Sequence, residues 1–227
     1  GQNAVWLMDD SDSISIAPSG EHDFRTMLNT HELPVVDTRG GDDTAMIVYS
    51  SGTSGKPKGV VLSHDNMVTG THIFELLSFG EWGPKSVVIG VLPFFHIFGL
   101  NFFALSSFLC ATPVVVIPRF DLTVFCGAVQ RFKCTQALVV PPMLLALSRH
   151  PAVDKFDMSS LKAALSGAAP LGPELIEEVQ ARLPHLRISQ GYGLSETSPV
   201  LLRASPEDHD MYKGCLLYTS PSPRDGL

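Results

Sequence analysis

Residues 163–190 read AALSGAAPLGPELIEEVQARLPHLRISQ, and this stretch decides the fold class. Short runs at residues 163–166 and 187–190 predict two strands, because each is bounded by turn-forming residues. The segment between them, residues 173–182, is predicted as a helix. A strand, a helix and a second strand in succession indicate two parallel strands with the helix packed on one face of their sheet.

The same alternation extends along the chain. Further strands are predicted at residues 45–50, 87–92, 114–117 and 137–140, and further helices at residues 66–77, 99–110 and 142–149. The predicted fold class is therefore α/β, a mostly parallel sheet covered by helices on both faces. No transmembrane segment is predicted, because Pro93, Gly99 and Pro113 divide the uncharged stretch 86–118 into pieces shorter than the roughly 20 residues that a bilayer requires.

Composition excludes several classes of protein. The 227 residues include 16 Lys+Arg and 23 Asp+Glu, which give a net charge of −7, and 44% of them are hydrophobic. This acidic balance argues against a nucleic-acid partner, whose phosphates require Lys and Arg. Four cysteines without paired spacing predict buried thiols, and eight histidines without a zinc pattern predict no histidine metal site. A small molecule is the expected ligand.

The two ends of the chain differ from its middle. Residues 1–36 are predicted to be an acidic connector from an incomplete N-terminal region, since acidic residues there alternate with small polar ones. Residues 215–227 begin CLLYTSPSPRD, which resembles a translated transposase adapter from DNA sequencing, and are predicted to be non-native. Both native termini are therefore expected to be missing. Localisation is left open.

The stretch SSGTSGKPKG at residues 50–59 follows a predicted strand. Its hydroxyls, glycines and two lysines are suited to a polyphosphate, because they bring donors, close backbone approach and positive charge together. The alternative is a plain connector, which Gly/Ser-rich loops often are. The Walker A spacing is absent, so an ordinary P-loop NTPase is disfavoured.

Two later segments also follow predicted strands. In SGAAPLG at residues 166–172, small side chains would let a flat ring lie against the backbone, although this loop could simply start the next helix. In QGYGLSETSP at residues 190–199, Tyr192 could stack on a base and Glu196 could bind Mg²⁺. The alternative there is a turn with Tyr192 packed inward. The serine-hydrolase signature G-x-S-x-G is not formed.

Together, these three segments resemble the adenylate-forming (AMP-binding) enzyme superfamily. SSGTSGKPKGV resembles its phosphate-loop signature, and QGYGLSET resembles its Y-G-x-[ST]-E signature. The 4-coumarate:CoA ligase-like acyl-CoA synthetases are the most similar branch, through PFFHIFGL at residues 93–100, VPPM at residues 140–143 and SGAAPLG. The resemblance spans residues 37–214, which would form the central part of the large N-terminal domain.

The resemblance implies ATP-dependent adenylation of a carboxylate, followed by transfer of the acyl group to coenzyme A, with Mg²⁺ as metal cofactor. It implies catalytic or metal-binding roles for Lys58, Ser195 and Glu196, the last as Mg²⁺ ligand. It implies nucleotide contacts by Ser51, Gly52, Thr53, Ser54, Gly55, Lys58, Gly167, Ala168, Ala169, Gln190, Gly191, Tyr192, Gly193 and Ser195. It implies acyl-substrate contacts by His96, Phe98, Gly167 and Gly191.

Two residues depart from the commonest family pattern. Phe98 stands where plant hydroxycinnamate ligases commonly have tyrosine, so an aryl or fatty carboxylate is favoured over a phenolic one. Ser195 stands where threonine is commonest and keeps the hydroxyl. The hinge, the C-terminal domain with the catalytic lysine and a T-G-D-like segment are not in the chain. The fragment is therefore expected to be nearly inactive, and the alternative is a non-catalytic nucleotide-binding fragment or pseudoenzyme.

Overall fold

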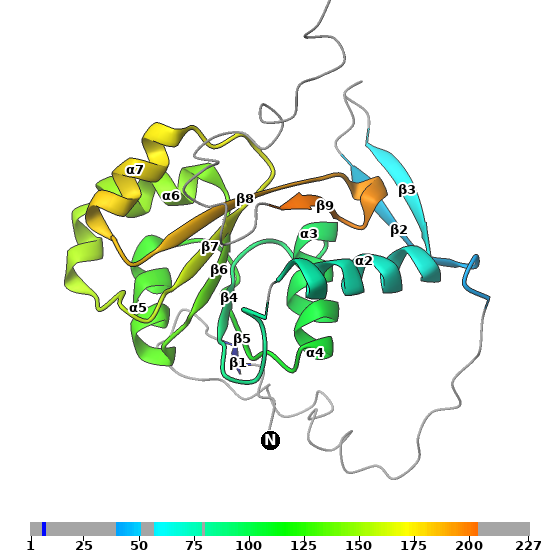
Figure 1. The fold of residues 1–227 in the computed structure, drawn as a ribbon, viewed down its shortest axis with the longest axis horizontal. Helices are drawn as coiled ribbons and strands as arrows, with labels where there is room; N and C mark the ends of the chain where they lie inside the picture. The colour runs from blue at the N-terminus through cyan, green and yellow to red at the C-terminus, as the bar shows by residue number, and fades with distance from the viewer. Residues whose placement is uncertain (1–5, 8–39, 51–56, 79, 204–227) are drawn as a thin grey trace, which may run out of the picture.

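A seven-stranded sheet forms the centre of the molecule in a computed structural model, which describes residues 6–7, 40–50, 57–78 and 80–203 (Figure 1). The strand order is β1-β5-β4-β6-β7-β8-β9, and all neighbours are parallel except β8 and β9. The strands are β1 (Trp6–Leu7), β4 (Val88–Gly90), β5 (Val114–Val116), β6 (Gln136–Val139), β7 (Ala163–Ser166), β8 (Arg187–Gly193) and β9 (Val200–Arg203).

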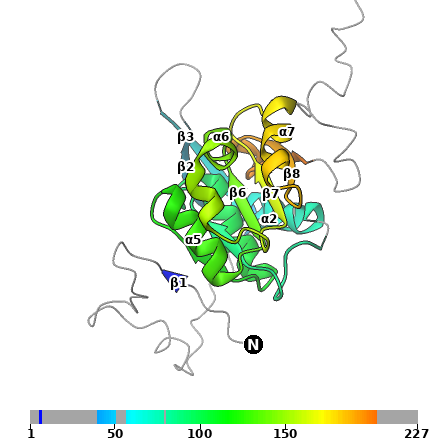
Figure 2. The same ribbon diagram turned by 90° about the vertical axis from the view of Figure 1, so that its left-hand side faces the viewer.

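Helices cover both faces of this sheet, as the sequence predicts. On one face lie α5 (Leu122–Phe132), α6 (Pro141–Arg149) and α7 (Pro173–Arg182), which stand in front of the sheet in Figure 2. A single-turn 3₁₀-helix, Pro151–Lys155, follows α6. On the other face lie α2 (His64–Leu77) and a continuous helical stretch made of α3 (Ile97–Gly99), a π-helix (Leu100–Ser106) and α4 (Ser107–Leu109).

Each face has its own hydrophobic core. Under α5, α6 and α7, the core includes the fully buried Phe125, Leu144 and Val179. Under α2 and the π-helix, it includes Phe74 and Phe102, whose rings meet edge to face at 4.2 Å between centroids. Burying each such side chain contributes about 1.5–3 kcal/mol, so the two cores hold the helices on the sheet.

A separate antiparallel hairpin precedes α2. It pairs β2 (Thr44–Ser50) with β3 (Lys58–Ser63), and Ser50 lies opposite Lys58 at its last paired position. Ser63 then caps α2: its hydroxyl accepts from the Asn66 amide N–H at 3.2 Å, and the Asn66 side chain accepts from the Ser63 N–H at 3.0 Å. This reciprocal cap starts the helix directly after the strand.

Several boundaries differ from the predictions. Strand β3 was not predicted, because its first residues belong to the phosphate-loop pattern. Helix α5 was not predicted either, although the Asp121 carboxylate caps it by accepting from the Val124 amide at 2.9 Å. The predicted helix at residues 99–110 is interrupted by the π-helix, and β8 is longer than predicted because β9 pairs with its end.

The cysteine prediction holds for two of the four thiols. Cys126 and Cys134 are buried, and burial raises the pKa of the Cys126 thiol to about 11 and that of the Cys134 thiol to about 12. Cys110 is only half-buried, and Cys215 lies outside the described residues. Among the helices that the structure describes, none is long and apolar enough to span a membrane.

Candidate functional site

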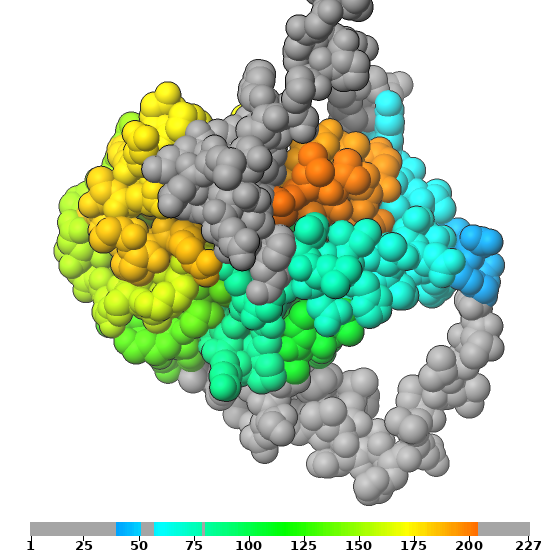
Figure 3. Space-filling view, in the orientation of Figure 1, coloured from blue at the N-terminus to red at the C-terminus, as the bar shows by residue number. Residues whose placement is uncertain are grey.

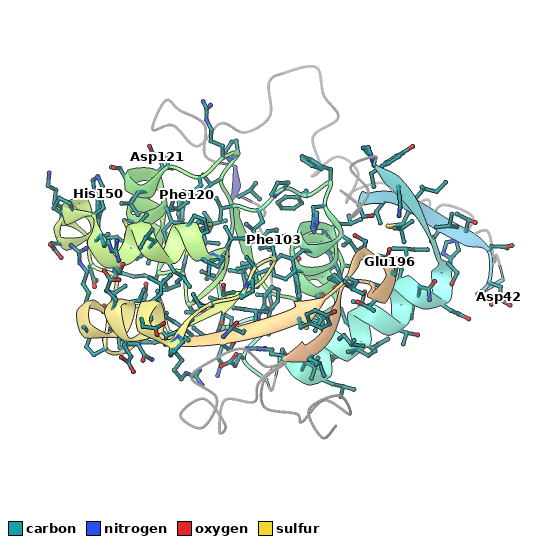
Figure 4. The ribbon with its side chains drawn as sticks, turned by 90° about the horizontal axis from the view of Figure 1, so that it is seen from above. Asp42, Phe103, Phe120, Asp121, His150 and Glu196 are labelled. Carbon is teal, nitrogen blue, oxygen red and sulfur yellow. The ribbon has the colours of Figure 1, made fainter. Side chains whose placement is uncertain are left out.

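The candidate site lies at the edge of the sheet where the parallel strands end. Because β4, β7 and β8 are parallel members of one sheet, their carboxyl ends lie at the same edge, where α/β proteins bind ligands. His96 and Phe98 follow β4, residues 167–172 follow β7, and residues 194–199 follow β8. Figure 4 shows Glu196 on the last of these segments, between the central sheet and the β2–β3 hairpin.

The phosphate-loop prediction falls mostly outside the described residues. This applies to Ser51, Gly52, Thr53, Ser54 and Gly55. Lys58 is described: it is exposed and begins β3. Both strands of the hairpin contact the 3₁₀-helix Ser195–Thr197 that follows β8. In Figure 3 the hairpin and the segment after β8 form one continuous surface, so residues nearly 140 positions apart come together here.

The loop after β7 meets the segment after β4. A Cβ placed on the buried Gly167 would lie 3.3 Å from the Phe98 ring, and its three nearest atoms all belong to that ring. Ala168 and Ala169 are exposed, and Ala168 adopts the left-handed conformation with φ 67°. The structure therefore brings Phe98 and Gly167 together. A side chain at position 167 would push the Phe98 ring out of its present position.

His96 is exposed at the site edge rather than buried in the core. Its Nδ1 accepts a hydrogen bond from the Phe98 amide at 3.2 Å and so caps α3. In the neutral ring this leaves the proton on Nε2, which is then a donor. The Phe98 ring packs edge to face on Phe102, with 4.6 Å between the centroids. Helix capping and ring packing thus fix both predicted substrate residues.

The residues from Gln190 to Gly193 belong to β8, so the predicted third loop begins only at Leu194. The Gln190 side chain accepts from the Leu171 N–H at 3.2 Å and donates to the Leu171 carbonyl at 3.0 Å. Its amide therefore ties the loop after β7 to β8. Tyr192 is half-buried and pairs with Leu202 of β9.

Two glycines of β8 lie in close contact with neighbouring strands. A Cβ on Gly191 would lie 3.4 Å from Leu165 Cδ1, which is a tight but ordinary contact. A Cβ on Gly193 would overlap the carbonyl of Pro199. Gly193 is therefore required for residues 194–199 to turn back into β9.

The segment 194–199 carries oxygen atoms that could act as metal ligands, on a backbone held by hydrogen bonds. The Thr197 hydroxyl accepts from the Leu194 amide at 2.9 Å and lies 2.9 Å from the Pro199 carbonyl oxygen, so this side chain holds the turn together. Ser195 is half-buried and Glu196 is exposed. A carboxylate beside a hydroxyl is a hard-oxygen donor set, which suits Mg²⁺. The described residues contain no cluster of three or more His, Cys, Asp or Glu side chains that could hold a metal.

One buried polar residue next to the site was not predicted. Asn101 of the π-helix is fully buried and reaches the backbone of the segment 194–199. The only sequence signal was an amide side chain within an uncharged, apolar stretch. Sequence alone gives no partner for such a side chain.

Comparison with known proteins identifies the family of this chain. The AMP-binding enzyme family matches residues 5–217, so the chain belongs to this family. The α/β fold is that of the large N-terminal domain of adenylate-forming enzymes.

Two of the relatives described below are named as CoA ligases. A 4-coumarate–CoA ligase 2 of Nicotiana tabacum is 39% identical over 196 residues, which are 83% of this chain and 35% of that protein. ATP-bound MatB of Rhodopseudomonas palustris has 29% identity and a TM-score of 0.66, covering 74% of this chain and 32% of that one. A long-chain-fatty-acid-CoA ligase of Archaeoglobus fulgidus has 27% identity and a TM-score of 0.68, covering 76% and 35%. The chain thus spans about a third of the length of its relatives.

Proposed function

We propose that the whole protein is an acid–thiol ligase that joins a carboxylate to coenzyme A through an acyl-adenylate. The observation that carries this proposal is the placement of three segments at one sheet edge: the hairpin whose second strand begins at Lys58, the Ser195–Thr197 helix that it contacts, and the Phe98–Gly167 contact. A basic residue, oxygen donors and an apolar wall are what ATP, Mg²⁺ and an acyl chain require. The ATP-bound relative supports the same assignment.

In the first step the carboxylate attacks the α-phosphate of ATP and pyrophosphate leaves. Lys58 and the hydroxyls of Ser51, Thr53 and Ser54 orient the β- and γ-phosphates and offset their charge. Ser195 donates to phosphate. Glu196 would hold Mg²⁺, which would supply positive charge against the phosphates. Tyr192 and residues 167–169 border the adenine.

In the second step the thiol of coenzyme A attacks the acyl carbonyl of the acyl-adenylate; the C–S bond of the thioester forms, the bond to the phosphate oxygen breaks, and AMP leaves. The acyl group lies against Phe98 and Gly167, with the exposed His96 beside them. Because Phe98 has no hydroxyl, this wall offers contact area and no hydrogen bond, which favours an aryl or fatty carboxylate over a phenolic one.

The 227 residues by themselves are proposed to be inactive, because they match only about a third of the relatives' length. The alternative is a fragment or pseudoenzyme that binds nucleotide without turnover. Lys58 and Glu196 support nucleotide binding in both cases, so only turnover separates the two.

The test begins with the native gene, sequenced past the codon for Gly214 and expressed in full. ATP–pyrophosphate exchange is measured with a panel of aryl and fatty carboxylates, and thioester formation is then measured with coenzyme A. Lys58→Ala is expected to lower exchange by about 100-fold, the usual loss for one charge-stabilising donor. Lys85→Ala is the matched control, because Lys85 is equally exposed but precedes β4 at the opposite edge of the sheet.

Exchange that depends on a carboxylate and on Lys58 supports the ligase. Nucleotide binding without exchange for any carboxylate would favour the alternative. Equal losses in the two lysine variants would remove Lys58 from the site.

A further inference from the structure

Asn101 lies at the centre of a buried hydrogen-bond network that joins three distant segments. Its side-chain NH₂ donates to the Thr71 hydroxyl of α2 at 3.2 Å and to the Ser198 carbonyl at 3.2 Å. Its side-chain oxygen accepts from the Ser106 hydroxyl at 3.0 Å, and Thr71 in turn donates to the Met67 carbonyl at 2.7 Å. Both amide hydrogens and the amide oxygen are therefore used, as a buried amide requires.

The residue held by this network is conformationally strained. Ser198 adopts the left-handed conformation, with φ 60° and ψ 48°, which residues with a side chain rarely adopt. Its carbonyl is fixed from two sides: Asn101 donates to it, and α2 approaches so closely that any side chain at Gly70 would overlap it. The Ser198 hydroxyl is buried and has no hydrogen-bond partner among the described residues. The Asn101 contact is thus the side-chain hydrogen bond that holds Ser198 in this conformation.

Ser198 ends the turn that carries Ser195 and Glu196. The Ser198 N–H donates to the Ser195 carbonyl at 3.4 Å, so a shift of Ser198 would be passed to the turn, which the Thr197 hydroxyl holds together as one unit. The π-helix also helps to hold Ser198, because it brings Asn101 and Ser106 together in the same buried space. Such helices are rare and frequently occur at functional sites.

We propose that Asn101 is a positioning residue for the metal- and phosphate-binding turn, holding Glu196 where Mg²⁺·ATP binds by fixing the Ser198 carbonyl. This inference rests on the proposed function for the role of Glu196. Asn101 itself contacts neither substrate nor metal in this proposal. Asn101 acts on Glu196 through its hydrogen bond to the Ser198 carbonyl.

The positioning itself is tested without any ligand, by amide hydrogen exchange of the full-length protein expressed from the native gene. Asn101→Leu retains the size of the side chain but leaves the Ser198 carbonyl and the Ser106 hydroxyl unpaired. Asn101→Ala is the milder second variant, because the space it opens can admit water. Ser107→Ala is the matched control: it removes a buried hydroxyl from the same helical stretch, one whose hydrogen bonds within the described part of the chain go to the carbonyls of Phe103 and Ala104.

Exchange in peptides covering residues 194–203 is expected to rise about tenfold in both Asn101 variants and to remain unchanged in Ser107→Ala. Far-UV circular dichroism checks that each variant is folded. If Asn101→Ala folds and exchanges in this segment at the wild-type rate, the positioning role is overturned.

The functional consequence is measured as the factor by which Mg²⁺ tightens ATP binding, compared with binding in EDTA. This factor is expected to fall about tenfold in the Asn101 variants and to stay at the wild-type value in Ser107→Ala. A general loss of stability would instead weaken binding equally with and without Mg²⁺. Glu196→Gln separates the two proposals: an unchanged factor in this variant would refute the metal role of Glu196, while the exchange data judge Asn101 independently.

Discussion

Gly70 lies in the interior of α2, and replacing it by alanine sets helix propensity against tertiary packing. By propensity alone, Gly70→Ala would stabilise the protein by about 1 kcal/mol, because glycine is that much less favourable than alanine inside a helix. Packing predicts the opposite. A Cβ on Gly70 would overlap the Ser198 carbonyl oxygen and lie 2.9 Å from Ser198 Cβ, and the overlapping atom is backbone that cannot simply rotate away.

The two effects can be compared in magnitude. Forcing an extra carbon into a packed site costs about 1–3 kcal/mol. Displacing the Ser198 carbonyl also breaks its hydrogen bond from Asn101, which costs about 1 kcal/mol more. After the propensity gain of about 1 kcal/mol is subtracted, Gly70→Ala is expected to lower the free energy of unfolding by about 1–3 kcal/mol.

Urea unfolding followed by far-UV circular dichroism measures this difference. Gly127→Ala is the matched control, because Gly127 is also interior to a helix, α5, and its added Cβ would meet Phe156 at an ordinary 3.7 Å. This control is expected to gain up to about 1 kcal/mol from propensity. A Gly70→Ala protein as stable as Gly127→Ala would refute the close approach of α2 to Ser198 and, with it, part of the support for Asn101.

Three further predictions concern buried or nearly buried side chains. Phe102→Ala empties a fully buried ring site and should lower the free energy of unfolding by about 3–5 kcal/mol in the same urea assay, whereas a loss below 1 kcal/mol would show the site to be loosely packed. Glu81→Gln removes the negative charge of the carboxylate that accepts a hydrogen bond from Arg203 at 2.7 Å. Because both side chains are nearly buried, this change should lower the free energy of unfolding by about 3 kcal/mol. An unchanged free energy of unfolding would show that the pair is solvated. Burial raises the pKa of Cys126 from its ordinary value near 9 to about 11, so the folded state holds this proton more tightly than the unfolded state; its contribution to stability is complete below pH 9 and should be lost as pH rises from 9 to 11, a loss that Cys126→Ala should lack.

Elements with local signals were predicted well. The boundaries of β7 and α7 agree with the prediction, because turn residues border the strand and proline begins the helix. Helix α5 also had a local signal in its Asp121 cap, and this signal was overlooked. Strand β3 had none that could be recognised, because lysine and glycine at its start are common in loops as well.

Elements that depend on distant partners were predicted less well. Strand β8 continues through Gly193 because β9 pairs with it, and neither residue type nor periodicity marks that pairing. Gln190 is predicted from the family motif to bind nucleotide, and the structure shows its side chain making two hydrogen bonds to Leu171. The motif could not indicate these hydrogen bonds.

The sequence by itself determined the α/β class and the family, because strand and helix periodicity and short family motifs depend on neighbours along the chain, and it supplied the residues proposed for the site. The tertiary structure decided which side chains support the site. Asn101 and Ser198 are 97 positions apart, and nothing in either neighbourhood specifies the other. Their contact exists because one core, which includes Phe74 of α2 and Phe102 of the π-helix, docks both elements onto one face of the sheet, and the packing of that core depends on residues from distant parts of the chain.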